Sequence, residues 1–502
     1  MTPFPAFESF KKTYEDGKAQ VVWTTLVADL ETPVSAMLKL AEGRPNSFLL
    51  ESVEGGATRG RYSFIGLKPD LIWRCFGDKA EINRRARFDP HTFEPCTAGA
   101  IDSLRDIAQE SRIDLPEDLP PMAAGLVGYM SYDMVRLVEH LPAQNPDVLG
   151  TPDGIFVRPT VIAIFDNIED VVTVVTPVRP VSETSAQAAF DQARERLADI
   201  VSDFGRGLPY RREAGAGSGE LPQPASNVSR EEFHAMVEKG KEYILAGDIF
   251  QVVLSQRFQL PFELPPFALY RSLRRLNPSP FLYFLDFGNF SVVGSSPEIL
   301  VRVRDGKVTI RPIAGTRPRG KDREEDKALA EDLLRDPKEL AEHLMLLDLG
   351  RNDVGRVAEI GSVRVTEHMA IERYSHVMHI VSNVEGKLDP EMDAMDALFA
   401  GFPAGTVSGA PKVRAMEIID ELEPDRRSIY AGCIGYFGAD GEMDTCIALR
   451  TAVVKDGTMF VQAGGGIVAD SDPESEFQES CNKARALLRA AEEAVRFAAK
   501  TG

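Results

Sequence analysis

The sequence predicts an α+β fold of mainly antiparallel β-sheets flanked by helices. Residues 157–165 and 172–178 are rich in β-branched side chains and are bounded by Pro and Asp, which is typical of strands. A helical pattern covers 186–201, and beyond residue 229 strands and helices alternate irregularly. A doubly wound fold would show regular βαβ units, so antiparallel sheets are favoured over it.

The chain is long and acidic. Its 502 residues include 57 Lys and Arg against 77 Asp and Glu, which gives a formal net charge of −20. Length alone suggests about three domains and is ample for a large core. A surface of this charge repels nucleic-acid backbones and anionic membranes, so neither is expected as a main partner.

The cysteines and the apolar segments indicate in which cellular compartment the protein is expected. The five cysteines are scattered and no pair has CxxC spacing, so neither a disulfide framework nor a structural zinc site is indicated. The N-terminus lacks the apolar run of a signal peptide, and nowhere do 18 apolar residues follow one another. We therefore expect a cytoplasmic protein without a membrane span.

A Gly-, Ser- and Pro-rich stretch at 211–228 divides the chain. Its low apolar content cannot offset the entropy lost on ordering, so we expect a flexible linker there. The linker would separate an N-terminal region, 1–210, from a C-terminal region, 229–502.

The C-terminal region is predicted to begin with a helix and a strand. Ser229 and Glu232 have capping-box spacing before an apolar stripe that stops at Gly247. A strand-like run follows over 249–257. Within it, Gln251 shares a face with the residues two and four positions on, and from the pattern alone it is a polar residue near a strand end.

Two predicted helix starts resemble each other, because each begins with Asp-Pro, a favourable N-cap and first helical position. Each then carries two Glu side chains spaced i, i+3 on one face: Glu339 and Glu342 in the first helix, Glu476 and Glu479 in the second. Four carboxylates could thus meet at one point, an arrangement that suits Mg²⁺. The alternative is that these side chains only complement the helix dipoles.

Two glycine-rich segments are candidate anion sites. Residues 401–412 precede an amphipathic helix whose N-terminal N–H groups could bind a carboxylate or phosphate. In 462–468, three successive glycines allow a close backbone approach to a ligand. Between them, Arg450 lies in a strand-like run and could hold a carboxylate in a fork. Plain turns and a surface ion pair are the alternatives.

Taken together, several blocks of this sequence resemble the chorismate-utilising enzymes, most of all the members that form anthranilate. The resemblance spans essentially the whole chain and is densest from Gln251 to Lys483. It is carried by residues 294–298, 311–317, 342–353, 374–379, 405–406 and 476–483. The resemblance implies two stacked, largely antiparallel sheets flanked by helices.

The resemblance also implies a reaction: addition of ammonia at C2 of chorismate, loss of the C4 hydroxyl, and elimination of pyruvate to leave anthranilate. Glu342 and Glu479 are then expected as direct Mg²⁺ ligands, with Glu339 and Glu476 reaching the ion directly or through water. Glu298 is expected as the general acid on the C4 hydroxyl, which requires a raised pKa.

By the same resemblance, other side chains are expected around the substrate. The enolpyruvyl carboxylate is assigned to Arg450, Tyr430 and the backbone of Gly464, Gly465 and Gly466. Thr406 and His379 are expected to line the ring, with His379 assisting pyruvate elimination, and Lys483 to sit beside the metal-bound carboxylate.

Two positions separate this chain from relatives with other products. Water-adding members usually carry a lysine where this chain has Gln251, which cannot act as a base. Aminodeoxychorismate-forming members often carry a nucleophilic lysine where this chain has Ala314, followed by Gly315 and Thr316. Direct attack by ammonia and an ortho product are therefore expected. An aminodeoxychorismate synthase lacking that lysine, and a non-catalytic tryptophan-binding regulator, remain the alternatives.

The resemblance further implies feedback inhibition by tryptophan and a partner. The expected effector pocket is formed by Leu50, Glu51, Ser52, Asn277, Pro278, Ser279, Pro280 and Phe281, whereas Leu282 departs from the family's usual Met. No cysteine lies in a nucleophile elbow, so a separate glutamine amidotransferase subunit is expected to supply the ammonia. Alone, this chain is expected to use ammonium salts but not glutamine.

Overall fold

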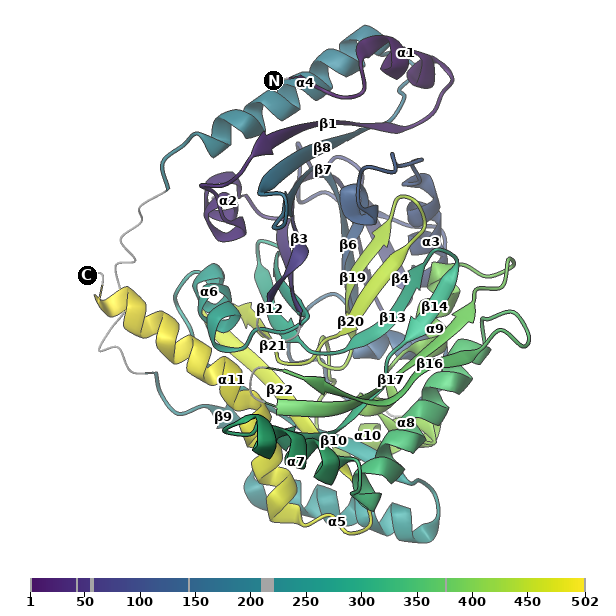
Figure 1. Ribbon diagram of the computed structural model, residues 1–502, viewed down its shortest axis with the longest axis vertical. Helices are drawn as coiled ribbons and strands as arrows, with labels where there is room; N and C mark the ends of the chain where they lie inside the picture. The colour runs from purple at the N-terminus through teal and green to yellow at the C-terminus, as the bar shows by residue number, and fades with distance from the viewer. Residues whose placement is uncertain are drawn as a thin grey trace.

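The computed structural model describes residues 2–41, 44–54, 58–142, 145–208, 221–374 and 377–500. Every described strand pairing is antiparallel, and helices cover the outside of the sheets (Figure 1). The predicted α+β fold class is therefore confirmed. None of the helices in these ranges combines the length and apolar character that crossing a membrane requires.

The sheet divides into two arms at one central strand pair, β3 (Thr58–Phe76) with β7 (Gly154–Asp166). The first arm continues through β2 (Ser47–Glu54), β11 (Phe281–Asp286), β12 (Phe290–Ser296), β21 (Thr451–Lys455), β22 (Thr458–Ile467) and β10 (Gln251–Pro261). The second arm continues through β6 (Gly125–Met130), β19 (Cys433–Gly438), β20 (Met443–Ile447), β13 (Ile299–Arg304), β14 (Lys307–Ile310) and β17 (Val377–Lys387).

Further strands complete the edges. They are β1 (Gln20–Val27) and β8 (Val171–Val178) beside β7, β4 (Lys79–Asn83) and β5 (Glu94–Pro95) beside β3, β15 (Ile313–Pro318) and β16 (Arg364–Arg373) beside β17, and β9 (Ala225–Ser226) and β18 (Gly409–Ala410) beside β10.

The two arms stack with a hydrophobic core between them. This core joins Tyr283 and Val292 from the first arm to Val127 and Ile434 from the second. One group of helices packs on the outer face of the first arm: α1 (Phe7–Glu15), α2 (Pro33–Leu40), α4 (Ala186–Phe204), α6 (Pro266–Leu276) and α11 (Pro473–Lys500). Another group packs on the second arm: α3 (Ala100–Glu110), α8 (Pro337–Gly355) and α9 (Ala394–Gly401). This is the layered arrangement that the family resemblance implies.

The remaining helices flank the lower end of the molecule in Figure 1. They are α5 (Arg230–Ala246), α7 (Arg323–Leu333) and α10 (Lys412–Leu422). The predicted start and end of α5 are confirmed, because Ser229 and Glu232 form a capping box and Gly247 ends the helix with a φ of 85°. Asp336 caps α8 by accepting the Lys338 N–H at 3.0 Å, also as predicted.

The two halves of the chain share one sheet. Strand β2 of the N-terminal half pairs with β11, and β6 pairs with β19. Residues 211–220 of the predicted linker lie outside the described residues. The last part of the predicted linker is ordered and packs on the sheet, because β9 pairs with β10 and the Asn227 N–H donates to the Arg257 carbonyl at 2.9 Å.

Two connections cross from one arm to the other, side by side. The chain leaves the first arm after β12 and enters the second at β13, passing through Glu298. It returns from β20 to β21 through Arg450. The crossovers are tied together, because Ile447 N–H donates to the Glu298 carbonyl at 3.0 Å and Ser295 N–H donates to the Arg450 carbonyl at 3.2 Å.

Candidate active site

Glu298 lies buried at the first crossover. Its side chain is 8% exposed. Burial raises the pKa of its carboxyl to about 8, an effect that Thr406, Arg450 and Lys483 offset only in part. At neutral pH the carboxyl is therefore mainly protonated, which is what a general acid requires.

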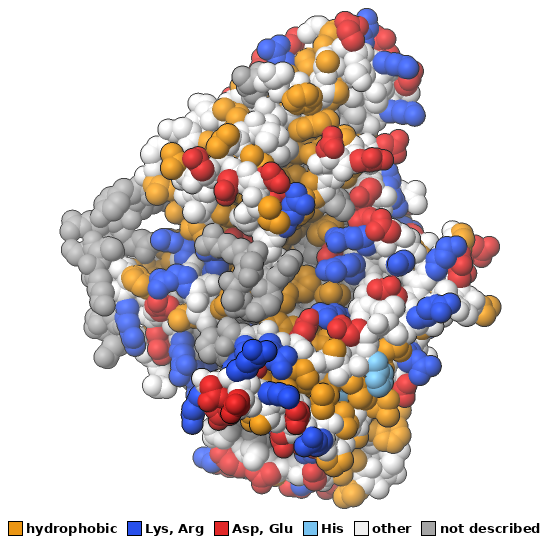
Figure 2. Space-filling view, viewed as in Figure 1, with side chains coloured by type: hydrophobic (Ala, Val, Ile, Leu, Met, Phe, Trp, Pro, Cys, Tyr) orange, Lys and Arg blue, Asp and Glu red, His pale blue; other side chains and the backbone are white. Residues whose placement is uncertain are grey.

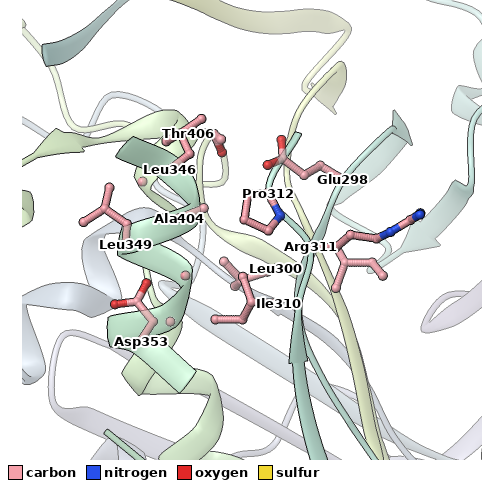
Figure 3. A pocket seen from close by; sticks show the side chains of 14 residues that line it. Glu298, Leu300, Ile310, Arg311, Pro312, Leu346, Leu349, Asp353, Ala404 and Thr406 are labelled. Carbon is pink, nitrogen blue, oxygen red and sulfur yellow. The ribbon is translucent and has the colours of Figure 1, made fainter. Parts of the chain in front are cut away.

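A small cavity of about 30 Å³ lies beside Glu298. Figure 3 shows Glu298 and Thr406 at one end of it and Asp353 at the other. Thr406 belongs to the 3₁₀ turn η3 (Gly405–Val407), and its buried Oγ1 faces the carboxyl of Glu298, whose pKa it lowers. A hydroxyl and a carboxyl therefore lie together at this end of the cavity.

Arg450 lies at the second crossover in a strained conformation. Its φ of 48° is left-handed, a region that non-glycine residues occupy at a cost and mostly at functional sites. Burial lowers the pKa of its guanidinium, and the charge of Glu298 opposes this only in part. Within the described residues, Arg450 forms no side-chain hydrogen bond or ion pair. Its fork is therefore free to bind a ligand carboxylate.

The glycines of β22 lie against the second acidic helix. A Cβ placed on Gly465 would lie 2.9 Å from Glu476 Oε2 and 3.5 Å from Glu479 Oε1, whereas one on Gly466 would lie 2.3 Å from Gln251 Nε2. Glycine is thus needed here because the side chains opposite approach the backbone itself.

Tyr430 and Lys483 contact the first of these glycines. Tyr430 is hydrogen-bonded to the Gly464 backbone, and burial raises the pKa of its hydroxyl to about 12. Lys483 Nζ donates to the Gly464 carbonyl at 2.9 Å and lies 2.7 Å from Glu479 Oε1. Gly464 therefore lies between the phenol of Tyr430 and the ammonium group of Lys483.

The first acidic helix reaches the same place. Glu342 accepts a hydrogen bond from Gln251 Nε2 at 3.3 Å. Burial raises the pKa of Glu342, and the nearby charges of Glu339 and Glu479 raise it further. Burial and the charge of Glu479 likewise raise the pKa of Glu476. The two helices therefore bring their carboxylates close enough to repel one another.

These carboxylates do not form a ready-made metal cage. Across the described ranges, no three acidic, His or Cys side chains come together closely enough to hold an ion. Two of the four carboxylates are instead paired with basic side chains: Glu339 accepts from Arg317 at 3.1 Å, and Glu479 pairs with Lys483.

His379 lies across from β15 and is held through one ring nitrogen. Its Nδ1 is 3.1 Å from both Thr316 Oγ1 and the Gly315 carbonyl. Burial lowers the pKa of the imidazole. Its ring meets that of Tyr374 edge-on, with centroids 5.4 Å apart. A neutral imidazole with Nδ1 engaged leaves Nε2 available, and the nearby Ala314 side chain offers no nucleophile.

Comparison with known proteins decides the family. A family model described as chorismate binding enzyme matches residues 57–489. The chain belongs to the chorismate binding enzyme family. The resemblance inferred from the sequence blocks is thereby confirmed.

Two relatives are similar in sequence to this chain along nearly its whole length. Anthranilate synthase component 1 of Cereibacter sphaeroides is 62% identical over 497 residues, 99% of each chain. The same component of Aquifex aeolicus is 48% identical over 491 residues, 97% of each chain.

Solved structures agree on the fold. Anthranilate synthase component I of Streptococcus pneumoniae superposes with a TM-score of 0.75 at 38% identity, covering 85% of this chain and 92% of that one. The menaquinone-specific isochorismate synthase of Escherichia coli gives a TM-score of 0.70 at 20% identity, covering 97% and 99%, and supports the fold alone.

In this family member, a large cavity of about 880 Å³ reaches the residues expected to bind tryptophan. Its wall includes Leu50, Glu51, Ser52, Pro280 and Phe281. Strand β11 pairs with β2 there, with Leu282 opposite Glu51. The face shown in Figure 2 is hollowed near its middle, with hydrophobic side chains inside and charged ones on the rim.

Not every predicted effector residue faces this cavity. Asn277, Pro278 and Ser279 are absent from its described wall. Asn277 Nδ2 instead donates to Ser295 Oγ at 3.3 Å.

Glu51 lines the cavity, yet its carboxylate already has partners. Tyr270 donates to its Oε2 at 2.5 Å, and Arg274 donates to Oε2 and Oε1 at 2.6 and 2.8 Å. A ligand would therefore have to share these oxygens with Tyr270 and Arg274.

Sequence reasoning missed two residues that support the site. Arg427 is fully buried and holds backbone carbonyls of both β10 and η3, and Arg317 holds Glu339. Arg427 lies four positions after Glu423, but both lie beyond the end of α10, so helical spacing gave no signal for this pair. Arg317 lies within a recognised block, but nothing in that block indicates its partners.

Proposed function

We propose that this chain converts chorismate and ammonia to anthranilate and pyruvate, and that this reaction serves tryptophan synthesis. The observation that carries the proposal is the pair of crossovers, which sets a protonated Glu298 beside an uncompensated Arg450. Chorismate is a dianion with a poor leaving hydroxide, so its enzyme needs both a cation and an acid. The names of the relatives support the same reaction.

Each group has a step that it can perform. Arg450 and the hydroxyl of Tyr430 bind the enolpyruvyl carboxylate. As ammonia bonds to C2 and both ring double bonds shift, Glu298 protonates the departing C4 oxygen, which leaves as water. In the second step Nε2 of His379 takes the C2 proton while the C–O bond to the enolpyruvyl group breaks, and the released enolpyruvate is protonated to pyruvate.

The acidic cluster supports a Mg²⁺ ion as cofactor. Glu342 and Glu476 are half-buried carboxylates. Burial and the charge of Glu479 raise the pKa of both, and a cation would relieve that repulsion. Mg²⁺ keeps several waters and needs few protein carboxylates, so Glu342 and Glu479 with Glu339 and Glu476 nearby fit it. When bound, it would supply Lewis acidity toward the ring carboxylate.

Regulation by tryptophan is part of the proposal. The expected pocket is large enough for an indole side chain. A short chain of contacts starts at Asn277, three residues before the pocket residue Pro280, and ends at the active site: Asn277 is hydrogen-bonded to Ser295, and Ser295 N–H donates to the Arg450 carbonyl. A shift of this segment on tryptophan binding would therefore move Arg450.

We further propose that a glutamine amidotransferase subunit supplies ammonia. In this assignment the chain alone accepts ammonium salts and gives no product with glutamine. Adding the partner subunit would restore activity with glutamine.

The test incubates the purified chain with chorismate, Mg²⁺ and ammonium at mildly alkaline pH and records anthranilate fluorescence. Glu298→Gln is expected to lower turnover at least about 100-fold, the usual contribution of a general acid, while tryptophan binding persists. Chorismate consumption without fluorescence would indicate an aminodeoxychorismate product instead. Retained tryptophan binding without turnover in the unmodified chain would indicate a regulator.

A further inference from the structure

Arg317, near the end of β15, binds three carboxylates at once. Its Nε donates to Asp332 Oδ2 at 2.9 Å, its Nη2 to Asp336 Oδ2 at 2.7 Å and its Nη1 to Glu339 Oε1 at 3.1 Å. Each guanidinium nitrogen therefore has an acidic partner of its own. The planar fork of arginine allows such multiple contacts, whereas a lysine ammonium group is a single point charge.

The three carboxylates lie at the corner where α7 is followed by α8. Asp332 belongs to the last turn of α7, Asp336 is the N-cap of α8, and Glu339 lies in the first turn of α8. Asp336 is used twice, because its Oδ1 accepts the Lys338 N–H while its Oδ2 accepts from Arg317. Arg317 thus ties the start of the first acidic helix to the sheet.

The contact between Arg317 and Glu339 is confined on several sides. The side chain of Arg317 is only 20% exposed, and its Nη1 also donates to the Thr316 carbonyl at 3.1 Å. The second oxygen of Glu339 lies against the backbone of Gly315, where an added Cβ would be 3.1 Å from Oε2. Glu339 is therefore held between an arginine and the backbone of β15.

The ion pair on the second acidic helix is much looser. Lys483 and Glu479 are 45% and 49% exposed and are spaced i, i+4 on α11. The ammonium group holds this one carboxylate and the Gly464 carbonyl. An exposed pair of this kind contributes little and opens easily, whereas Arg317 would have to leave three carboxylates to release one. The two paired carboxylates of the site are therefore not equivalent.

Glu339 lies close enough to Glu342 for its charge to act there. Burial raises the pKa of Glu342, and the charge of Glu339 adds to the effect. A divalent cation beside Glu342 would therefore also attract Glu339. Arg317 competes with such a cation for the same carboxylate.

We propose that Arg317 is a positioning residue that keeps Glu339 paired and thereby limits the affinity of the four-carboxylate site for Mg²⁺. This inference rests on the proposed function, in which Mg²⁺ is the cofactor. With fewer protein carboxylates, Mg²⁺ retains more of its waters, and a substrate carboxylate can replace such a water. By fixing the start of α8, Arg317 also fixes the place of Glu342, one turn further along the helix.

Calorimetric titration of the purified full chain with MgCl₂, without substrate and at constant ionic strength, tests the proposal. Arg317→Gln is expected to bind Mg²⁺ at least about fivefold more tightly than the parent, because Glu339 and its charge become available. A residue that only stabilised the fold would give weaker binding when replaced.

The matched control is Arg319→Gln, which removes the same charge two positions further on. Arg319 donates to Asp326 Oδ1 at 2.7 Å and to the Tyr374 carbonyl at 2.6 Å. Because these partners lie outside the two acidic helices, Arg319→Gln should leave the Mg²⁺ affinity within about twofold of the parent.

A second pair of variants shows whether the effect passes through Glu339. In the Glu339→Gln background, adding Arg317→Gln is expected to change the Mg²⁺ affinity by less than about twofold, because no carboxylate remains to be released. An equal gain in both backgrounds would show that only the charge of Arg317 acts, and would overturn its role in holding Glu339.

Thermal unfolding and near-ultraviolet circular dichroism establish that each variant is folded. If Arg317→Gln does not fold, Arg317→Lys replaces it in the test. This variant keeps the charge, but an ammonium group cannot hold all three carboxylates, so a gain in Mg²⁺ affinity of at least about twofold is expected.

The outcomes separate this inference from the proposed function. If the parent binds Mg²⁺ and the folded Arg317 variant binds it equally or more weakly, the role of Arg317 is overturned and the proposed cofactor stands. If the parent binds no Mg²⁺, the proposed cofactor is overturned, and the role of Arg317 with it.

Discussion

Two arginines, the fully buried Arg427 and the partly buried Arg450, lie 23 positions apart and differ in almost every respect. Arg427 is fully buried and completely paired: it donates to Glu423 at 2.9 and 2.6 Å and to the carbonyls of Val407 and Val253, each at 2.6 Å. Arg450 has no such partners among the described residues and sits in a left-handed conformation.

Their electrostatics differ in the same sense. Burial would lower the pKa of Arg427, but the charge of Glu423, its hydrogen bonds to Arg427 and the nearby Tyr132 and Tyr430 together hold that pKa above its ordinary value. For Arg450 burial prevails and the pKa is lowered. Arg427 is therefore built into the fold, whereas Arg450 is held ready for a ligand that brings its own negative charge.

The largest expected effect is on the paired arginine. Arg427→Met should reduce the free energy of unfolding by about 3–5 kcal/mol, because it leaves the carboxylate of Glu423 buried without its cation. Urea denaturation measures this loss. Adding Glu423→Gln removes the stranded charge while keeping an acceptor for Ser255, and should restore at least half of the loss. A loss below about 1 kcal/mol would contradict the structural role.

Glu298, which acts on the pKa of Arg450, should make the stability of the chain depend on pH. Its pKa is about 8 in the folded chain against an ordinary value of 4.5. The folded state therefore binds this proton more tightly than the unfolded state does. The stability that this carboxyl contributes is fully present below pH 4.5 and is lost as the pH rises through 8.

Glu298→Gln removes this dependence. Relative to the parent, the variant should be more stable by a few kcal/mol at pH 9 and similar at pH 4.5, as measured by urea denaturation at both values. If the free energies of unfolding of variant and parent differ by the same amount at pH 4.5 and pH 9, the carboxyl of Glu298 is not held protonated.

Arg450→Gln should separate activity from stability. We expect kcat/KM for chorismate to fall about 100-fold, a typical loss for one charge-stabilising group, with the free energy of unfolding within about 1 kcal/mol of the parent. Arg450→Lys should recover little, because an ammonium group lacks the fork. If Arg450→Gln unfolds as readily as Arg427→Met, the contrast between the two arginines fails.

The smallest effect concerns the link from the effector pocket. Ser295→Ala removes the hydroxyl that contacts Asn277 but keeps the N–H that donates to Arg450. The tryptophan concentration for half-inhibition should rise about threefold, near 0.6 kcal/mol of coupling, while kcat stays within twofold. Unchanged inhibition would remove Ser295 from the coupling.

Sequence patterns predicted those parts of the molecule that depend on close neighbours. The cap of α5 at Ser229 and Glu232, its stop at Gly247, and the Asp336 cap of α8 each involve groups a few residues apart, so their spacing was informative. The linker predicted over 211–228 was wrong in its last residues. There β9 pairs with β10, and composition cannot indicate a partner strand some 30 residues later.

What the sequence determined by itself is therefore the antiparallel α+β class, the helix ends and, through its ordered blocks, the identity of the candidate groups. Only the tertiary structure decided which of them carry uncompensated charge. Glu298 and Arg450 are 152 positions apart and become neighbours because both arms cross over at one place. The state of a buried charge depends on everything packed around it, whereas a cap depends on the next turn of chain.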